Sequence, residues 1–250
     1  MQGLLALYTA SPLEYAACMY RRRSTDGIVG MFADIAGRYD LMNTLMSFGM
    51  DKRWRKRVVR LARLFPGAAM LDVGAGTGRI TLEAARSCPG ARIVALDITP
   101  EMMAIGRRIT PPWVSWDLGG ALRLPFPDRS FDAVTSGFMV RNVPDASLSF
   151  SEQLRVLKPG GTVVCLDAGP LGQGMLEPLA RFHLERIIPW LGAVVTGHAQ
   201  AYRYLPDSTK AFMDAERTAS LMRETGFVEV GFERYMLGAI FIVHGRRPLS

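Results

Sequence analysis

Residues 68–79 read AAMLDVGAGTGR, and this stretch decides the fold that we expect. The apolar residues before the glycines predict a buried strand at 68–73, and the following RITLEAARS predicts a helix at 78–87. Gly74, Gly76 and Gly78 form the turn between them, because glycine permits a sharp turn and a close backbone approach to a ligand. A strand, a glycine turn and a helix N-terminus together bring backbone N–H groups up to a bound molecule.

The spacing of these glycines argues against two common nucleotide-binding motifs. The pattern is G-x-G-x-G, so the third glycine of a G-x-G-x-x-G dinucleotide motif would fall on Arg79. The phosphate loop G-x-x-x-x-G-K-[ST] does not occur in the sequence. NAD and ATP are therefore not the ligands that we expect first.

Two carboxylates stand at the ends of neighbouring expected strands. Asp72 lies just before the turn, where a carboxylate repels a pyrophosphate but suits an ammonium group. Asp97 closes the next expected strand, at 91–97, where an acidic side chain can accept both hydroxyls of a ribose. A cationic amino-acid group and a ribose without phosphate describe S-adenosylmethionine, and the pairing resembles the cofactor site of class I methyltransferases. The alternative is a glycine turn that only packs a helix on the sheet.

Strands and helices alternate along the rest of the chain. We expect strands at 112–117, 131–136 and 162–167, helices at 99–109, 146–156 and 208–225, and closing strands at 227–234 and 238–245. Such repeats predict a parallel sheet with right-handed crossovers, with ligands at the carboxyl ends of its strands. The expected fold class is α/β, a Rossmann-like class I methyltransferase fold. It has a seven-stranded, mostly parallel sheet with helices on both faces, plus helical N-terminal and lid segments.

We expect one domain with a lid, since 250 residues suit a single domain. Its parts are an N-terminal extension at 1–30, a helical cap at 31–65, a cofactor-binding core at 66–170, a lid or substrate segment at 171–207, and a C-terminal helix with closing strands at 208–250. The cap reads as two helices with a kink near Ser47-Phe48-Gly49. Met42 and Met46 share one helix face, which forms either a wall of an apolar ligand site or ordinary core.

The composition excludes several functional classes. Three widely separated cysteines form neither a disulfide framework nor a metal cluster, so we expect a reducing, cytoplasmic setting and no metal. No run reaches 18 apolar residues, so no membrane span is expected. The net charge is +7, and the densest basic cluster, at 53–63, either attracts anionic lipid or nucleic acid or is a solvated helix face. Trp54 is the single aromatic residue within this cluster, which does not make a stacking surface, so nucleic acid is not an expected partner.

Two segments carry a resemblance to a known family. Residues 39–43 read YDLMN, with Leu45, Ser47 and Trp54 following, and residues 155–161 read RVLKPGG. Both are similar to signatures of the ubiquinone/menaquinone biosynthesis C-methyltransferases. LPFPDRSFD at 124–132 and VRNV at 140–143 are also similar, and the resemblance extends from Met31 to about Gly245. It implies an S-adenosylmethionine-dependent enzyme that methylates the ring of a reduced isoprenoid quinone precursor of the demethylmenaquinol or ubiquinol type.

The chain departs from the family pattern at several positions. Asp51 stands where the family usually has His, Gly120 where it has an acid near the adenine, and Gly137 where it has Ser. Residues 166–169 read LDAG, where the family usually has LEFS. Two other functions therefore stay open. One is methylation of another small apolar acceptor, such as a phenol, sterol or lipid, and the other is a cofactor-binding module without activity.

The residues and the resemblance together define the expected site. The resemblance implies Arg141, Asn142 and Tyr39 at the acceptor. Arg141 would stabilise a developing phenolate, and the other two would orient the ring or a water. A structural ion pair is the alternative for Arg141. Asp51 and Asp167 are expected to be structural, and His183, His198 and His244 non-catalytic. The expected cofactor-binding residues are Asp72, Gly74, Ala75, Gly76, Thr77, Gly78, Asp97, Ile98, Met102, Gly120, Ala121 and Gly137.

An isoprenoid quinone resides in lipid, so we expect the enzyme to open an apolar mouth at a membrane surface as a peripheral protein. The basic stretch 53–63 and the segment IIPWLG at 187–192 would supply charge and apolar contact. The alternative for the second segment is a helix pair packed on the sheet edge. The sequence does not decide the oligomeric state, and a homodimer stays open.

Overall fold

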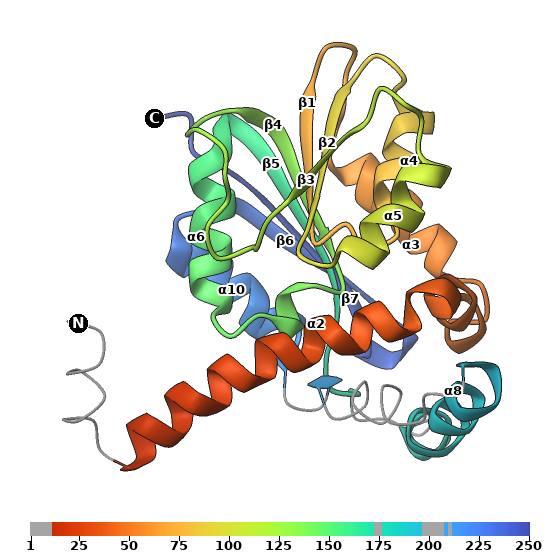
Figure 1. Ribbon diagram of the computed structural model, residues 1–250. Coiled ribbons are helices and arrows are strands. Elements are labelled where there is room, and N and C mark those ends of the chain that lie inside the picture. The colour runs from red at the N-terminus through yellow and green to blue at the C-terminus, as the bar shows by residue number, and fades with distance from the viewer. Residues whose placement is uncertain (1–11, 173–176, 197–207, 210–211) are drawn as a thin grey trace, which may run out of the picture.

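A seven-stranded sheet forms the centre of the protein in the computed structural model, which describes residues 12–172, 177–196, 208–209 and 212–250 (Figure 1). The strand order is β3-β2-β1-β4-β5-β7-β6, with β7 antiparallel between β5 and β6 and the other pairs parallel. This confirms the expected mostly parallel sheet. The strands are β1 Ala69–Val73, β2 Arg92–Asp97, β3 Ser115–Leu118, β4 Phe131–Gly137, β5 Leu157–Ala168, β6 Val228–Tyr235 and β7 Ile240–Arg246.

Helices cover both faces of the sheet, as expected for this fold (Figure 1). On one face α3 and α4 bury Trp54, Val58 and Ile80 against the strands. On the other face α6 and α10 bury Phe150 and Met222. Each face thus removes its own apolar layer from water, which is the main stabilising contribution in such folds. The helices are α2 Pro12–Met46, α3 Asp51–Leu61, α4 Arg79–Ser87, α5 Pro100–Ile109, α6 Ala146–Val156, α7 Glu177–Phe182, α8 Ile188–Thr196 and α10 Ala215–Thr225, with short turns η1 Val140–Asn142, η2 His183–Ile187 and η3 Met236–Gly238.

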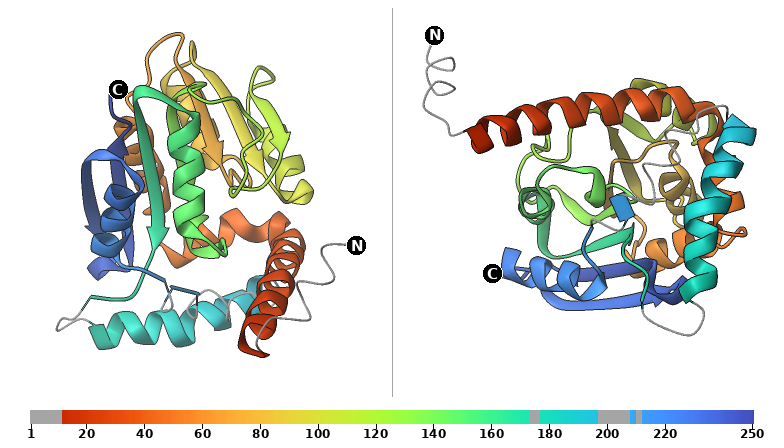
Figure 2. Two further views of the ribbon diagram at one scale, coloured as in Figure 1. Left: turned by 90° about the vertical axis from the view of Figure 1, so that its left-hand side faces the viewer. Right: turned by 90° about the horizontal axis from the view of Figure 1, so that it is seen from below.

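The first long helix and the α7–α8 segment lie across the end of the sheet at which the parallel strands finish (Figure 2). Helix α2 spans 35 residues and passes residue 30 without a break. It ends before a turn that contains Phe48 and Gly49, both at positive φ, so the expected kink is confirmed. Ile35 and Met42 pack against Ile188 of α8, and Arg38 donates a hydrogen bond to the Val195 carbonyl. The two segments therefore form one helical layer over the strand ends.

Three expected boundaries were wrong, each for a local reason. Helix α10 begins at Ala215, not at 208, because Asp214 caps it by accepting the Arg217 N–H at 2.8 Å. Strand β3 begins at Ser115, since a turn closed by Val114 N–H and the Pro111 carbonyl precedes it. Strand β5 begins at Leu157, ahead of the Lys-Pro-Gly-Gly sequence, and its pairing with β4 shifts register there.

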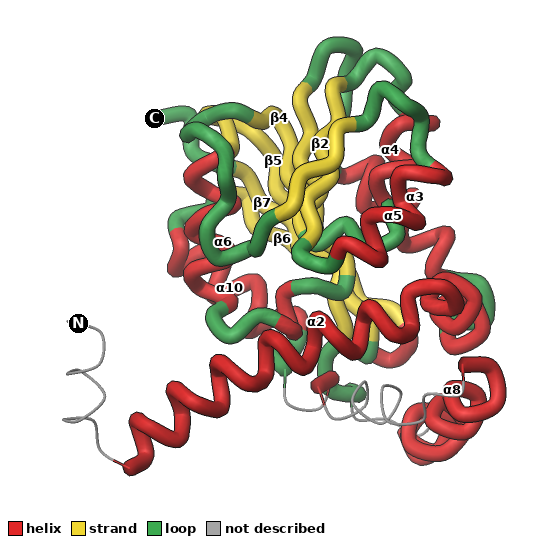
Figure 3. The backbone as a smooth tube through the Cα atoms, viewed as in Figure 1, coloured by secondary structure: helices red, strands yellow, loops and turns green. Residues whose placement is uncertain are grey.

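Parts of the expected segments lie outside the described residues. These are residues 1–11 of the expected N-terminal extension and residues 173–176 and 197–207 of the expected lid. The described part of the lid is helical, as the tube drawing shows (Figure 3). Among the described residues, no helix combines the length and apolar composition needed to cross a bilayer.

Trp116 of β3 packs directly on a helical glycine, and this contact yields a stability prediction. A Cβ at Gly106 of α5 would lie 2.1 Å from the indole, whereas a Cβ at Gly37 of α2 would meet nothing within 4 Å. Gly106→Ala should therefore lower the free energy of unfolding by about 1–3 kcal/mol through overpacking. The same substitution at Gly37 should be neutral or raise it by up to about 1 kcal/mol. Urea denaturation of both variants is the measurement, and equal effects would contradict the packing argument.

Candidate active site

The turn between β1 and α4 depends on glycine at the positions where the backbone is left-handed. Gly74, Gly76 and Gly78 have φ values of 66°, 57° and 73°. A Cβ at Gly74 would lie 2.3 Å from Met139 Cγ, so a side chain there would displace the loop that follows β4. The turn is also tied to β2, because the Ala75 N–H donates to the Leu96 carbonyl at 2.9 Å. Glycine thus brings the turn and the loop after β4 into direct contact.

Asp97 at the end of β2 holds the glycine turn and the start of α5 together. One carboxylate oxygen accepts the Gly76 N–H at 2.6 Å, and the other accepts the Thr99 N–H at 2.8 Å. Burial raises the pKa of this carboxyl above its ordinary value, although the backbone hydrogen bonds oppose the shift. Asp97 also lines a cavity beside the turn, so its carboxylate lies where a ligand can meet it.

Asp72 anchors the N-terminus of α4 to the sheet. Its Oδ2 accepts the Thr81 hydroxyl at 2.6 Å and the Thr81 N–H at 3.1 Å, and its Oδ1 accepts the Thr135 hydroxyl at 2.8 Å. The side chain is 1% exposed. Burial raises the pKa of Asp72 to about 6, and the hydrogen bonds from Thr81 and Thr135 limit the shift.

The cavity beside the turn, which we call the turn cavity, has a volume of about 390 Å³. Eight of the expected cofactor-binding residues line it, namely Gly74, Gly76, Asp97, Ile98, Met102, Gly120, Ala121 and Gly137. Asp72, Ala75 and Thr77 instead line a small adjoining cavity of about 50 Å³. Gly78 lines neither, since it begins α4 and packs against Trp116.

Helix α2 supplies a wall of the turn cavity. Tyr39 was an expected site residue, but the sequence interpretation missed Val29 and Phe32, whose spacing of three and seven residues from one another and from Tyr39 is the signal of a common helix face. Asp40 fastens this helix to the turn by accepting the Thr77 hydroxyl and the Arg79 Nε–H, both at 2.8 Å. Burial raises the pKa of the Tyr39 phenol, against the nearby charge of Arg141.

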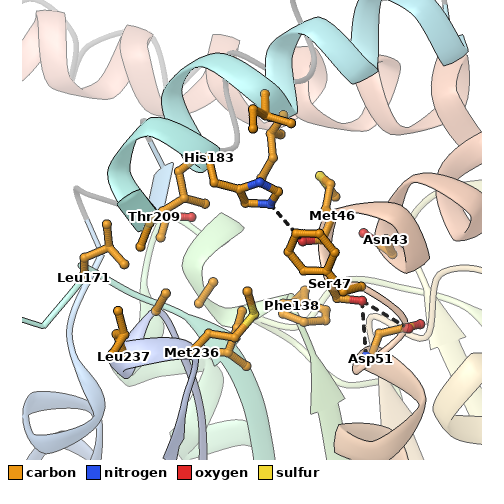
Figure 4. A pocket seen from close by; sticks show the side chains of 18 of the residues that line it. Asn43, Met46, Ser47, Asp51, Phe138, Leu171, His183, Thr209, Met236 and Leu237 are labelled. Atoms are coloured by element: carbon orange, nitrogen blue, oxygen red, sulfur yellow. Dashed lines mark hydrogen bonds between the residues drawn. The ribbon is translucent and has the colours of Figure 1, made fainter. Parts of the chain in front are cut away.

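A second cavity of about 480 Å³ adjoins the first and is mostly apolar (Figure 4). We call it the apolar cavity. Phe138 lines both cavities, so the two cavities share this residue in their walls. The polar residues that line the apolar cavity, among those that the structure describes, are Asn43, Ser47, Asp51, Arg141, His183 and Thr209. The methionine face was expected to be either a cavity wall or ordinary core. Met46 lines this cavity, whereas Met42 is fully buried in the core.

Arg141 forms the structural ion pair that was the alternative reading, and it also lines the apolar cavity. Its Nη1 lies 2.6 Å from Asp167 Oδ1, its backbone N–H donates to Asp167 Oδ2 at 3.1 Å, and both side chains are almost fully buried. The guanidinium lies 5.2 Å from the centre of the Phe138 ring. Asp167 is thus the structural partner that we expected, and it fixes the orientation of Arg141 in the cavity wall.

The structure separates the three expected acceptor residues. Asn142 and Tyr39 line the turn cavity, and Asn142 Nδ2 donates to the Phe138 carbonyl at 2.9 Å. Only Arg141 of the three lines the apolar cavity. Phe138 lines both cavities, and the Arg141 guanidinium is still near enough to Tyr39 to act electrostatically on its phenol.

The histidines fall in three different settings. His183 lines the apolar cavity, with Nε2 3.2 Å from the Met46 carbonyl and its ring stacked on Phe48. The sequence interpretation had given it no place in the site, because only the packing of η2 on α2 brings it there. His244 lies in β7, where burial lowers its pKa, and His198 lies outside the described residues. Within the described residues, no three His, Cys, Asp or Glu side chains gather as a metal site would require.

The raised pKa of Asp72 gives a prediction for stability against pH. The folded state holds this proton up to about pH 6, whereas an unfolded aspartate releases it near pH 4, so the stabilising effect of the proton is lost as pH rises through about 4–6. Asp72→Asn removes the titration. We therefore expect the variant to gain on the order of 1 kcal/mol relative to the wild type between pH 5 and pH 7. Parallel urea unfolding at the two pH values measures this, and unchanged pH dependence would contradict it.

Comparisons with known proteins agree with this geometry. The model of the ubiE/COQ5 methyltransferase family matches residues 20–247. A ubiquinone/menaquinone biosynthesis C-methyltransferase of Desulfotalea psychrophila is 43% identical over 88% of this chain and 89% of its own. A demethylmenaquinone methyltransferase of Thermus thermophilus is 42% identical over 87% of this chain and 100% of its own.

Solved structures support the fold alone, because their sequences are distant. A methyltransferase of Thermotoga maritima covers 88% of this chain and 99% of its own, with a TM-score of 0.61 and 18% identity. A phosphoethanolamine N-methyltransferase of Haemonchus contortus, solved with S-adenosylmethionine, has a TM-score of 0.58 and 18% identity over 78% of this chain and 52% of its own. The extent of the family match and the identity to the curated relatives show that this chain is an S-adenosylmethionine-dependent methyltransferase of the ubiE/COQ5 family.

Proposed function

We propose that the enzyme transfers a methyl group from S-adenosylmethionine to a ring carbon of a reduced isoprenoid quinone. The observation that supports this most directly is an apolar cavity with one buried guanidinium in its wall, next to the cavity of the glycine turn. The names of two relatives, which refer to demethylmenaquinone and to ubiquinone/menaquinone biosynthesis, agree with such an acceptor.

The turn cavity fits the cofactor chemically. Asp97 offers carboxylate oxygens to the two ribose hydroxyls, and Ile98 and Met102 offer apolar surface to the adenine beside the Gly120–Ala121 backbone. Asp72 and the small cavity beneath the turn suit the amino-acid end, since a buried carboxylate favours a nearby ammonium group. When bound, S-adenosylmethionine supplies a methyl group on a positively charged sulfur. The protein then needs to hold the acceptor carbon in line with it, which lowers the entropic part of the barrier.

Arg141 is the residue that we assign to the acceptor oxygen. A hydroquinone hydroxyl titrates near pH 10, like tyrosine, and its ring carbons become strong nucleophiles when it ionises. A guanidinium in a water-poor cavity stabilises that oxyanion far more than it would in water. The buried Nε of Arg141 has no hydrogen-bond partner among the described residues, while Nη1 is held by Asp167. The Nη1 group is thus held by the protein, and the Nε–H is left to donate a hydrogen bond to a ligand. Asn142 and Tyr39 line the turn cavity and are proposed to orient the ring from the cofactor side.

The mouth of the apolar cavity suits an isoprenoid tail. Phe48, Leu179 and Phe182 line the cavity and are also 71%, 68% and 56% exposed, so they form an apolar rim. Trp190 on α8 is 63% exposed as well. Helix α3 and the turn after it carry exposed basic side chains that suit anionic headgroups, namely Lys52, Arg53, Lys56 and Arg60 on the helix and Arg63 in the turn. We propose that the α7–α8 segment acts as a lid at a lipid surface, from which the acceptor enters.

Replacing Asp97 tests the cofactor assignment. Asp97→Ala removes the carboxylate that would bind the ribose, so we expect the affinity for S-adenosylhomocysteine to fall about 10- to 100-fold, as for a lost hydrogen bond to a charged group. Isothermal titration calorimetry measures this. Asp128→Ala, which removes a carboxylate that is 69% exposed, is the matched control and should leave affinity unchanged. Unchanged affinity in Asp97→Ala would contradict the ribose assignment.

An acceptor screen tests the choice of substrate. The purified enzyme should methylate a prenylated demethylmenaquinol, kept reduced under anaerobic conditions, faster than a simple phenol or a sterol. Ala180→Trp narrows the apolar cavity near its rim and should lower kcat/KM for the prenylated quinol by about tenfold or more, with unchanged cofactor affinity. Turnover of a phenol or sterol without turnover of any quinol would replace this proposal with the second reading of the sequence, a methyltransferase of another apolar acceptor.

A further inference from the structure

Within the part of the chain that the structure describes, three buried side-chain atoms without a hydrogen-bond partner belong to residues that line the apolar cavity. They are Asn43 Nδ2, Asp51 Oδ2 and Arg141 Nε. A buried polar atom without a hydrogen bond costs about 1–3 kcal/mol, so two such nitrogens and one carboxylate oxygen that has only an ion pair require an explanation. Two of these atoms can donate hydrogen bonds and the third can only accept one. A ligand that fits them carries oxygens that accept and a hydroxyl that donates, as a hydroquinone does.

Asp51 is the accepting member of this set. It is the first residue of α3 and only 1% exposed. Ser47 fixes the carboxylate by donating its hydroxyl to Oδ1 at 3.2 Å, while the Asp51 N–H donates to Ser47 Oγ at 3.2 Å. Arg55 Nη1 lies 2.9 Å from Oδ2 and balances the buried charge, without making a hydrogen bond to that oxygen. The side chain is therefore held in place, with one oxygen still able to accept a proton.

Asp51 is better placed for proton transfer than the other titratable groups that line the cavity. Among the described residues these are Arg141, a guanidinium with no acceptor atom, and His183. His183 stacks on Phe48, which is 71% exposed, so it belongs to the mouth. The close view places Ser47 and Asp51 on the side of the cavity where Phe138 lies, and Phe138 also borders the turn cavity (Figure 4). The reacting ring carbon has to lie at that inner side.

We infer that Asp51 is the catalytic residue that accepts the hydroxyl proton of the acceptor, an inference that rests on the proposed function. As the O–H bond breaks, its proton goes to Asp51 Oδ2, and Arg141 and Asn43 donate hydrogen bonds to the ring oxygens. The ring carbon forms its bond to the methyl group, and the bonding pair of the departing C–S bond stays with sulfur. The proton on that ring carbon then leaves to water, and Asp51 returns its proton to the ring oxygen. The net products are the methylated quinol, S-adenosylhomocysteine and one proton.

The dependence of the rate on pH distinguishes this role from a structural one. Asp51→Asn keeps the shape but cannot take the proton, so we expect kcat at pH 7 to fall about 100-fold or more, the usual contribution of a general base. The loss should shrink about tenfold for each unit of rising pH toward 10, because the hydroquinone then ionises in solution. Affinity for S-adenosylhomocysteine should stay unchanged by calorimetry. The assay uses the full chain, with reduced prenylated demethylmenaquinol and S-adenosylmethionine under anaerobic conditions.

Three further variants keep the test decisive. Ser47→Ala breaks the same local hydrogen bonds but leaves the carboxylate, so its loss should be smaller and independent of pH. Asp51→His supplies another proton acceptor and should recover part of the rate at pH 7. Asp128→Asn is the exposed control and should behave as the wild type.

Two kinds of result would overturn the inference. One is a wild-type rate in Asp51→Asn, or a loss that does not change with pH and equals that of Ser47→Ala. The other is a kcat loss that shrinks with rising pH in a His183→Gln variant and not in Asp51→Asn. An active wild type with a fully active Asp51→Asn refutes this inference alone. A wild type that methylates no quinol refutes the proposed function and, with it, the role of Asp51.

Discussion

The contact between a glycine turn and the loop after β4 is the constraint on which the rest of the site depends. Gly74 leaves no room for a side chain against Met139, so β1 and β4 finish in direct contact. Asp97 then accepts a hydrogen bond from the Gly76 N–H, and Asp40 accepts one from the Thr77 hydroxyl. Carboxylates from β2 and α2, which are far apart in sequence, thereby hold the turn in one conformation. A larger residue at Gly74 would separate the elements that these carboxylates join.

The N-terminal helices carry both cavities, although they lie outside the sheet. Helix α2 walls the turn cavity with Val29, Phe32 and Tyr39, and the turn that follows it places Ser47 beside the apolar cavity. Asp51 and Trp54 of α3 continue that wall. Because one continuous stretch contacts both cavities, the position of one cavity relative to the other depends on how α2 and α3 dock on the core. Asp40 and Trp54 are the two anchors of that docking, one by hydrogen bonds and one by burial.

Two ion pairs with mostly buried side chains neutralise charge around the apolar cavity. Arg141 pairs with Asp167 and Arg55 with Asp51, and in each pair one atom is left without a hydrogen bond. Breaking a buried pair is costly, because the remaining charge loses its partner in a medium that solvates it poorly. Asp51 and Arg141, the two residues with these atoms, both line the apolar cavity, where a ligand can supply the missing hydrogen bonds. Asp72 differs, since it has no ion-pair partner among the described residues and is held by two neutral hydroxyls and one N–H. Burial raises its pKa to about 6.

The sequence by itself determined the strand, glycine turn and helix at 68–87, the acidic ends of β1 and β2, and the order of the elements, because apolar periodicity and glycine geometry are local properties. It also indicated eight of the residues that line the turn cavity, since strand ends meet at one edge of a parallel sheet. Tertiary structure alone decided that Val29 and Phe32 of α2 line that cavity, that Arg141 lines a different cavity from Asn142 and Tyr39, and that His183 and Asp51 line a shared apolar space. Those facts depend on how helices distant in sequence pack together. The local sequence pattern of a helix shows which face is apolar, but it does not show which other helix packs on that face.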